Sequence, residues 1–345
     1  MHDRFALLTT LAAGLLLACR AGSLVLQGDE PTAVVLEAFV PSAEEAPAET
    51  AAPGAVAAAA TQAATPAVGL PAERDTDQPY STHDQPDDVE GYQVHFVYAL
   101  PSDGEDAFLD VTGEIEMSAN AMNYWLHTKT GQRLRYDTAD GRLDITFIRL
   151  PYTADEISQE YRSINSLLEH WLKITGRARD NKLYVVYYDG FVVTSEGYCG
   201  LAPVPPKGIG QTAVLLLRGY NPTRDLPCPR SFTRSADYTG FFEVTILHEL
   251  LHMLGVVGEC APNYNGSHVN DHPQDLMYHQ YDGTFSPLFM YLDFGNDDYY
   301  NHGRADCPDL ARSIFLEPLP EGAEPPPRWE DTIRNIPPDP LGGIQ

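Results

Sequence analysis

The segment from Thr245 to Gly255, which reads TILHELLHMLG, constrains the fold more than any other part of the chain. Its two histidines, His248 and His252, are four residues apart, so on a helix they lie one turn apart on the same face and can bind one metal ion. Leucine and isoleucine fill most other positions, and a helix this apolar must be buried. Gly255 can end the helix in the left-handed conformation. We therefore expect a buried helix that carries a metal site.

Glu249 directly follows the first histidine. From there its carboxylate projects beside the two imidazoles, where it can accept a proton from a metal-bound water. Zinc suits neutral imidazole ligands, and a catalytic zinc site has three protein ligands and a water. The five-residue pattern H-E-x-x-H arises by chance in only about a few per cent of chains, an order-of-magnitude estimate. A buried helix with incidental histidines is the alternative.

With Gly255, the pattern becomes H-E-x-x-H-x-x-G and resembles that of the zincin class of zinc metallopeptidases, most closely the metzincins. The resemblance implies an α+β domain with a twisted sheet, a long backing helix and an active-site helix. It also implies zinc bound by His248 and His252, and hydrolysis of peptide bonds with Glu249 as the general base. The metzincin pattern places a third ligand three residues after the glycine, but that position here is Gly258.

A third zinc ligand must therefore come from another position. The loop at 261–278 follows the helix, and it offers His268, which we expect to be the third ligand because a neutral imidazole suits zinc. Asp271, His272 and Glu259 remain as alternatives.

The end of this loop, the sequence DLMY at 275–278, resembles the Met-turn of metzincins. The resemblance implies that Met277 forms a hydrophobic floor under the metal. An ordinary place in the core is the alternative for this methionine.

A second candidate ion site is the acidic segment LDFGNDDYY at 292–300. Oxygen-rich loops of this kind can hold calcium. The spacing does not match the helix–loop–helix calcium signature, and a solvated acidic turn is the other reading.

The charge of the chain narrows the range of partners. Asp and Glu number 49 against 22 Lys and Arg, which gives a formal net charge of −27. Such a surface repels phosphate backbones, so we expect no nucleic-acid partner and no adsorption to anionic membranes. The expected partner is a peptide or protein substrate. The alternatives are a lipid-anchored binding module with an inactive zincin fold and a zinc amidase that acts on a non-protein amide.

The first 19 residues predict an export signal. Arg4 precedes an apolar run at 5–18, and the run ends in the sequence LLAC, which resembles a bacterial lipobox with Cys19 as the lipidated residue. The run is too short for a permanent membrane span. We expect an exported protein held at the cell envelope by a lipid on Cys19, with plain secretion as the alternative.

The composition divides the rest of the chain into three parts. An Ala- and Pro-rich flexible linker is expected at 20–88, a zinc metallopeptidase-like domain at 89–317, and a Pro-rich C-terminal tail, which we expect to be extended, at 318–345. Four cysteines remain after Cys19, and three pairings of them are possible. We favour Cys199–Cys228 and Cys260–Cys307, since each would hold one loop on either side of the helix at 245–255.

Within the domain, apolar runs predict strands at 93–100, 143–148, 182–188 and 212–217. The last of these is expected at the sheet edge, where an extended peptide can pair with it. A short helix is predicted at 122–127. A long amphipathic helix is predicted to begin at Thr153, with Glu156 completing a capping box, and to run to Leu172.

Overall fold

The computed structural model describes residues 74, 80–194, 198–205, 208–222, 225–228, 232–278 and 286–343. The predicted export signal, with Cys19, and the predicted linker up to residue 73 lie outside these ranges. Within the described ranges, no helix is long and apolar enough to span a bilayer.

The described part of the chain forms a mixed α/β domain built around a mostly parallel sheet. Its helices are α1 (Glu114–Thr130), α2 (Ala154–Gln159), α3 (Ile164–Ile174), α4 (Phe241–Leu254) and α5 (Trp329–Arg334). Its strands are β1 (Gln93–Leu100), β2 (Arg133–Leu134), β3 (Thr138–Ala139), β4 (Arg142–Leu143), β5 (Ile145–Arg149), β6 (Lys182–Val193), β7 (Gly200–Leu201), β8 (Thr212–Asn221), β9 (Leu226–Pro227) and β10 (Leu316–Glu317).

The main sheet has the strand order β5-β1-β6-β8-β7. Strands β5, β1, β6 and β8 are parallel, whereas β7 and β9 pair with β8 in the antiparallel sense. Continuous apolar runs such as β1, which is buried along its whole length, are typical of parallel strands covered on both faces. The expectation that 212–217 forms the sheet edge is wrong, because β7 pairs with β8 there and becomes the edge strand.

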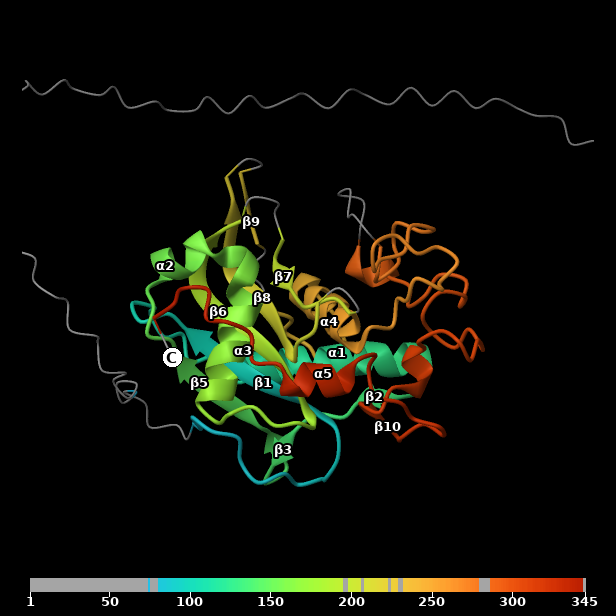
Figure 1. Ribbon diagram of the computed structural model, residues 1–345, viewed down its shortest axis with the longest axis horizontal. Helices are drawn as coiled ribbons and strands as arrows, with labels where there is room; N and C mark the ends of the chain where they lie inside the picture. The colour runs from blue at the N-terminus through green and yellow to red at the C-terminus, as the bar shows by residue number, and fades with distance from the viewer. Residues whose placement is uncertain are drawn as a thin grey trace, which may run out of the picture. The chain divides into compact units, whose positions relative to one another are not determined.

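Helices cover both faces of the sheet (Figure 1). Alternate residues of β6 point to opposite sides: Leu183, Val185 and Tyr187 belong to the core shared with α1 and α4, and Tyr184 and Val186 to the core shared with α3. The predicted α+β class is corrected to mixed α/β for this reason. The site helix α4 therefore lies against the sheet together with α1.

Helix α4 begins and ends with identifiable caps. The carboxylate of Glu243 accepts the backbone N–H of Gly240, and its other oxygen accepts the hydroxyl of Ser118 on α1. Gly255 stops the helix at φ 61°, ψ 29°, as the sequence predicts. These bonds fix the register of α4 against α1.

Two predicted helices differ from the observed ones. The short helix expected at 122–127 is part of the longer α1, which ends at Gly131 (φ 74°). The long helix expected from Thr153 has its capping box with Glu156, but it is divided into α2 and α3 by a 3₁₀ turn. Ser163 at the break has non-helical dihedral angles, and serine is a residue type that favours helix starts.

Residues 318–343 do not form an extended tail. Trp329 of α5 is 4% exposed and packs edge-on against Tyr92 and Phe315. The ammonium of Lys173 on α3 donates to two carbonyls that follow or belong to α5, and Tyr152 donates to Asp339. The prediction is wrong because one aromatic anchor and several hydrogen bonds outweigh a proline-rich composition.

The predicted linker also extends too far. Residues 80–88, which we call the N-terminal strap, lie on the domain. Lys182 Nζ binds Asp84 and Asp87 of the strap at 2.6 and 2.7 Å. It also binds Asp137 at 2.5 Å. Arg74 is buried and makes ion pairs with two aspartates of the domain.

Both favoured disulfides are present. Cys199–Cys228 joins the edge strand region to the end of β9, and Cys260–Cys307 joins the loop after α4 to the loop before β10. Their Cα–Cα separations are 5.6 and 5.8 Å.

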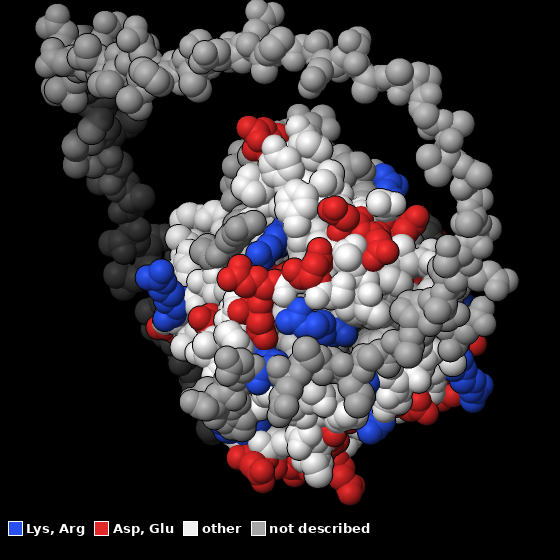
Figure 2. Space-filling view, turned by 90° about the vertical axis from the view of Figure 1, so that its left-hand side faces the viewer, with Lys and Arg blue, Asp and Glu red and all other residues white. Residues whose placement is uncertain are grey.

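Figure 2 shows one face of the molecule, on which acidic side chains stand directly beside basic ones near the centre. This face carries no continuous basic patch among its described residues.

Candidate metal centre

Three imidazoles converge at the C-terminal half of α4. His248 and His252 come from α4, and His268 comes from the loop that follows it. His252 Nε2 lies 3.0 Å from His248 Nε2 and 3.2 Å from His268 Nε2. The structure thus brings together the two local histidines and the distant one expected from the sequence.

Burial keeps the two helix imidazoles neutral. It lowers the pKa of His248 to about 4 and, together with the two neighbouring imidazoles, lowers the pKa of His252 well below its ordinary value. His248 Nδ1 donates a hydrogen bond to the carbonyl of Leu276 at 2.7 Å. That bond places the proton on Nδ1 and leaves the Nε2 lone pair for a metal.

The donor set fits zinc. Tetrahedral zinc with Zn–N bonds of about 2.0–2.1 Å requires ligand nitrogens roughly 3.3 Å apart. The two Nε2 separations of 3.0 and 3.2 Å are close to that spacing. Three imidazole ligands would leave one tetrahedral position open, which is the arrangement of a catalytic rather than a structural zinc site.

Glu249 lies beside these ligands under the edge strand. A Cβ atom placed on Gly200 of β7 would lie 2.6 Å from both Cγ and Oε1 of Glu249 and 2.7 Å from Thr245. Only a glycine at this position lets β7 pass directly over the carboxylate. Burial raises the pKa of Glu249 to about 8, and a bound dication would act in the opposite direction.

The other candidate ligands lie elsewhere. A Cβ on Gly258 would lie 2.9 Å from the sulfur of Cys260 and 3.0 Å from Pro308, so a ligand side chain has no room at the metzincin position. The ring of His272 stacks on Phe294 at 4.2 Å. Among the described groups that can hold a metal, neither Glu259 nor Asp271 joins the three histidines.

The segment under the site is held from several sides. Met277 is fully buried, and its carbonyl accepts the N–H of Val269, the residue after His268. The carboxylate of Asp275 accepts the N–H groups of Met277 and Phe294 and the hydroxyl of Tyr299. Whether Met277 underlies a metal, as the Met-turn resemblance implies, stays a prediction.

Two further clusters of acidic and histidine side chains occur in the described ranges. One of them consists of Asp84, His95, Asp137 and Asp144. The ammonium of Lys182 pairs with Asp84 and Asp137 and already supplies a positive charge there.

The other cluster joins Asp271 to Asp297 and Asp298 of the acidic segment. Asp293 of that segment instead accepts backbone N–H groups at 298–300. Calcium binding by this segment stays a prediction.

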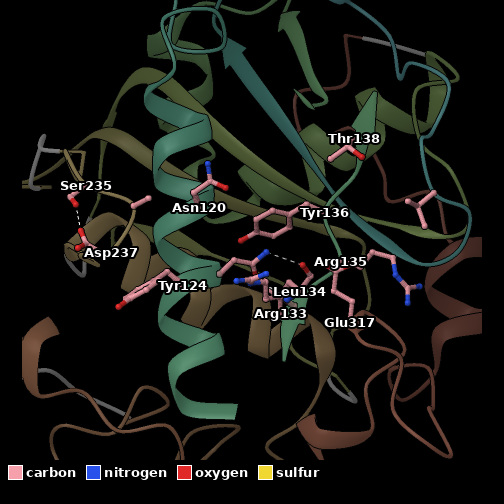
Figure 3. Close-up of a pocket in the computed structure, with 13 residues that line it drawn as sticks. Asn120, Tyr124, Arg133, Leu134, Arg135, Tyr136, Thr138, Ser235, Asp237 and Glu317 are labelled. Atoms are coloured by element: carbon pink, nitrogen blue, oxygen red, sulfur yellow. Dashed lines mark hydrogen bonds between the residues drawn. The ribbon is translucent and has the colours of Figure 1, made fainter. Parts of the chain in front are cut away.

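A cavity of about 750 Å³ lies away from these ligands, beside α1 (Figure 3). Asn120 and Tyr124 of α1 line it from one side, and Arg133, Arg135 and Tyr136 from the other. None of the described residues that line it belongs to the histidine group or is Glu249. The metal centre therefore does not depend on this cavity.

No protein-family model matches the chain, and no curated protein matches it. Among solved structures it is similar to archaemetzincin from Methanopyrus kandleri, with 15% identity over 56% of this chain and 84% of that one and a TM-score of 0.30. It is also similar to a catalytically inactive OgpA from Akkermansia muciniphila in complex with an O-glycopeptide substrate, with 13% identity over 65% of this chain and 63% of that one and a TM-score of 0.29. Likenesses this distant establish neither a family nor an activity.

Two parts of the site could not be found by sequence reasoning. Gly200 is distant from α4 in the chain, and nothing near it signals a contact with Glu249. The Leu276 carbonyl is a backbone group, so no residue type marks it. The DLMY sequence was the only local signal for the second of these.

Proposed function

We propose that this protein is a zinc-dependent metallopeptidase of the zincin type that hydrolyses peptide bonds. The observation that carries the proposal is the convergence of His248, His252 and His268 with Glu249 next to them on the same helix. Three imidazole ligands and an adjacent carboxylate are the protein groups that hydrolysis at a zinc site requires.

The residues then have separate tasks. Bound zinc supplies a Lewis acid that polarises the scissile carbonyl and lowers the pKa of water. His248, His252 and His268 hold the ion, and the bond to the Leu276 carbonyl orients the first of them. Glu249 takes the proton of the attacking water and passes it to the leaving amine.

The substrate would lie along β7. This strand ends the sheet, and Gly200 within it contacts Glu249. An extended peptide that pairs with the free edge of β7 would present its backbone to the carboxylate. Peptide or protein is the proposed substrate class for this reason.

Zinc content and a Glu249→Gln variant test the proposal. The purified full chain is expected to hold close to one zinc per chain and to cleave peptides in a fluorogenic library. Glu249→Gln should keep the zinc and lose roughly 10²–10⁴-fold in kcat, because general base catalysis contributes about that much.

Glu116→Gln on α1 serves as the control for the loss of a carboxylate and should cleave normally. Undiminished cleavage by Glu249→Gln would refute the assignment. Zinc binding without cleavage of any peptide would favour an amidase, and absence of zinc would favour an inactive binding module.

His268→Ala tests the third ligand. Removing one of three nitrogens should lower the zinc affinity strongly, as measured by competition with a chromogenic chelator. His272→Ala is the matched control, because His272 lies in the same loop and stacks on Phe294 instead. If His268→Ala kept the zinc as tightly as the control, another group such as Asp271 would have to be the ligand.

We also propose that the protein is exported and anchored by a lipid on Cys19. Two disulfides support an oxidising compartment, because such bonds rarely persist in the cytosol. Metabolic labelling with a fatty acid, compared between the native chain and Cys19→Ser, tests the anchor, and equal labelling would rule it out.

A further inference from the structure

The three-residue segment 275–277 fixes two of the three histidines. The carbonyl of Leu276 accepts the Nδ1–H of His248 at 2.7 Å. The carbonyl of Met277 accepts the N–H of Val269 at 2.8 Å, and Val269 directly follows His268. The position of this short segment therefore determines how a helix ligand and a loop ligand face each other.

Asp275 holds the segment in place. Its Oδ1 accepts the N–H of Met277 at 2.7 Å and the hydroxyl of Tyr299 at 2.9 Å, and its Oδ2 accepts the N–H of Phe294 at 2.7 Å. The side chain is fully buried, and these three hydrogen bonds all come from neutral donors. Burying a carboxylate with only neutral donors is costly, which marks this residue as more than a packing element.

Tyr299 links Asp275 to the next loop. Its hydroxyl donates to Asp275 and accepts the N–H of Asp293 at 2.8 Å. The carboxylate of Asp293 in turn accepts the N–H groups of Tyr299 and Tyr300 at 2.7 and 2.5 Å. One fully buried hydroxyl thus connects the segment under the histidines to the acidic loop.

We propose that Asp275 and Tyr299 are positioning residues of the metal centre, which hold the Leu276 and Met277 carbonyls so that His248 and His268 present Nε2 to one ion. The inference rests on the proposed function only in taking the three histidines as zinc ligands. Neither residue touches substrate; both act through the backbone of 276 and 277.

The physical effect is preorganisation. An imidazole that loses its Nδ1–H acceptor can rotate or adopt the other tautomer, and either change removes Nε2 from the ion. Loss of the outer hydrogen-bond partner of a metal ligand typically costs about 10- to 100-fold in metal affinity. The acceptor for His248 Nδ1–H is the backbone carbonyl of Leu276. A side-chain substitution can therefore remove this hydrogen bond only by moving segment 275–277.

Tyr299→Phe tests the positioning role by removing a single oxygen atom. Tyr184→Phe is the matched control: Tyr184 is 1% exposed, and its hydroxyl likewise accepts one backbone N–H and donates to one acceptor, but it lies in the core shared with α3. The measurements on the full chain are zinc affinity by chelator competition, the free energy of unfolding without metal, and the ¹H–¹⁵N signals of the histidine rings without metal.

The expected result is a loss of about 10- to 100-fold in zinc affinity for Tyr299→Phe. The His248 ring signals should change from a single Nδ1–H tautomer to a mixture. Tyr184→Phe should lose a similar amount of stability while its zinc affinity and ring signals match those of the native chain. Asp275→Asn replaces one of two accepting oxygens with an NH₂ donor and should weaken zinc binding in the same direction.

Two results would overturn the inference. One is equal zinc affinity in Tyr299→Phe and the native chain; the other is an equal loss of affinity in Tyr299→Phe and Tyr184→Phe, which would indicate general destabilisation. Failure of the proposed function looks different. A native chain that binds zinc with these variant effects but cleaves no peptide would refute the peptidase and leave the positioning residues in place.

Discussion

At the scale of single residues, the site depends on side chains that are absent as much as on those present. Gly200 leaves room for Glu249 beneath β7, and Gly258 leaves room for the Cys260 disulfide where a ligand would stand in the metzincin pattern. A glycine thus makes room for the carboxylate in one case and leaves no room for a ligand side chain in the other. A sequence motif that specifies only ligands and the general base reveals neither effect.

Gly200→Ala should reduce catalysis while zinc stays bound. The added methyl group would lie 2.6 Å from Oε1 of Glu249, so the carboxylate or β7 must shift. Displacements of about 1 Å in an active site can cost on the order of 10²-fold in rate, and we expect a loss of roughly 10- to 100-fold in kcat.

The control for this substitution is Gly104→Ala, whose methyl group would meet the ring of Pro101 at 2.8 Å instead. Steady-state kinetics and zinc content of both variants check the prediction. Equal kcat values for Gly200→Ala and the native chain would show that the carboxylate is not confined by β7.

The sequence determined part of the site at this scale. His248 and His252 lie one helical turn apart, so their spacing alone predicts that they share one face, and Glu249 directly follows the first of them. His268 was predicted from the chemistry of its side chain, and the structure brings it to the other two. The contacts of Gly200 and Leu276 depend on how distant segments pack, which local spacing does not encode.

At the scale of elements, apolar runs predicted the central strands well. The run at 93–100 has the bounds of β1, because most residues of a strand buried on both faces are apolar. Helices were predicted less well. Much of α1 consists of small and polar residues with little apolar pattern, and its extent is set by packing against α4 through contacts such as Ser118 with Glu243.

The N-terminal strap shows the same dependence on distant contacts. Like the linker before it, the strap has few large apolar residues, yet Asp84 and Asp87 bind Lys182 at the start of β6. Lys182 also binds the buried Asp137. A strand residue that binds three carboxylates fixes the strap to the sheet, and no pattern within 80–88 indicates this.

Asp137 should make this attachment sensitive to acid. Burial acts to raise the pKa of Asp137, but hydrogen bonds and charges from His95 and Lys182 outweigh it and hold the pKa below its ordinary value. A carboxyl group with a lowered folded pKa stabilises the protein fully above its unfolded pKa, near ~3.9, and loses that contribution as the pH falls through the folded pKa. The free energy of unfolding should therefore fall with decreasing pH below about 4.

Urea unfolding at a series of acidic pH values measures this slope. Asp137→Asn should be less stable at neutral pH and should show a shallower decline below about pH 4, since one titrating carboxylate is missing. Asp155→Asn in the first turn of α2 is the control, and its slope should match that of the native chain. Parallel curves for Asp137→Asn and the native chain would contradict the assignment.

At the scale of the whole molecule, the candidate metal centre joins two parts of the domain. Two of its histidines lie on α4, which packs on the sheet, and the third lies in the long loop region that follows it. Within the described residues, this region has few regular elements and is held by a disulfide and by side-chain bonds to the backbone. An ion that binds all three histidines would stabilise the folded state as a whole.

Removal of zinc should lower the melting temperature. At a free zinc concentration of about 100 times Kd, binding contributes about 2.7 kcal/mol, and in a domain of this size each kcal/mol shifts Tm by about 2–4 °C. We expect a decrease of roughly 5–10 °C after chelation, measured by calorimetry on the native chain.

Adding back zinc or calcium separately after chelation, and measuring Tm each time, shows which of the two predicted ions stabilises the fold. Recovery with zinc alone assigns the stabilisation to the histidines, and His268→Ala should not recover. Recovery with calcium alone would place the stabilising ion at Asp271, Asp297 and Asp298 instead. An unchanged Tm throughout would indicate that neither ion stabilises the fold.

The contact of Trp329 with Tyr92 also delays the completion of folding during synthesis. The two rings complete one part of the core with Phe315, but they are made far apart during synthesis. At about 5–20 residues per second, the ribosome adds Trp329 on the order of tens of seconds after Tyr92. Throughout that interval β1 and its neighbours cannot complete their packing, so the growing chain stays open to chaperones and to any machinery that needs an unfolded substrate.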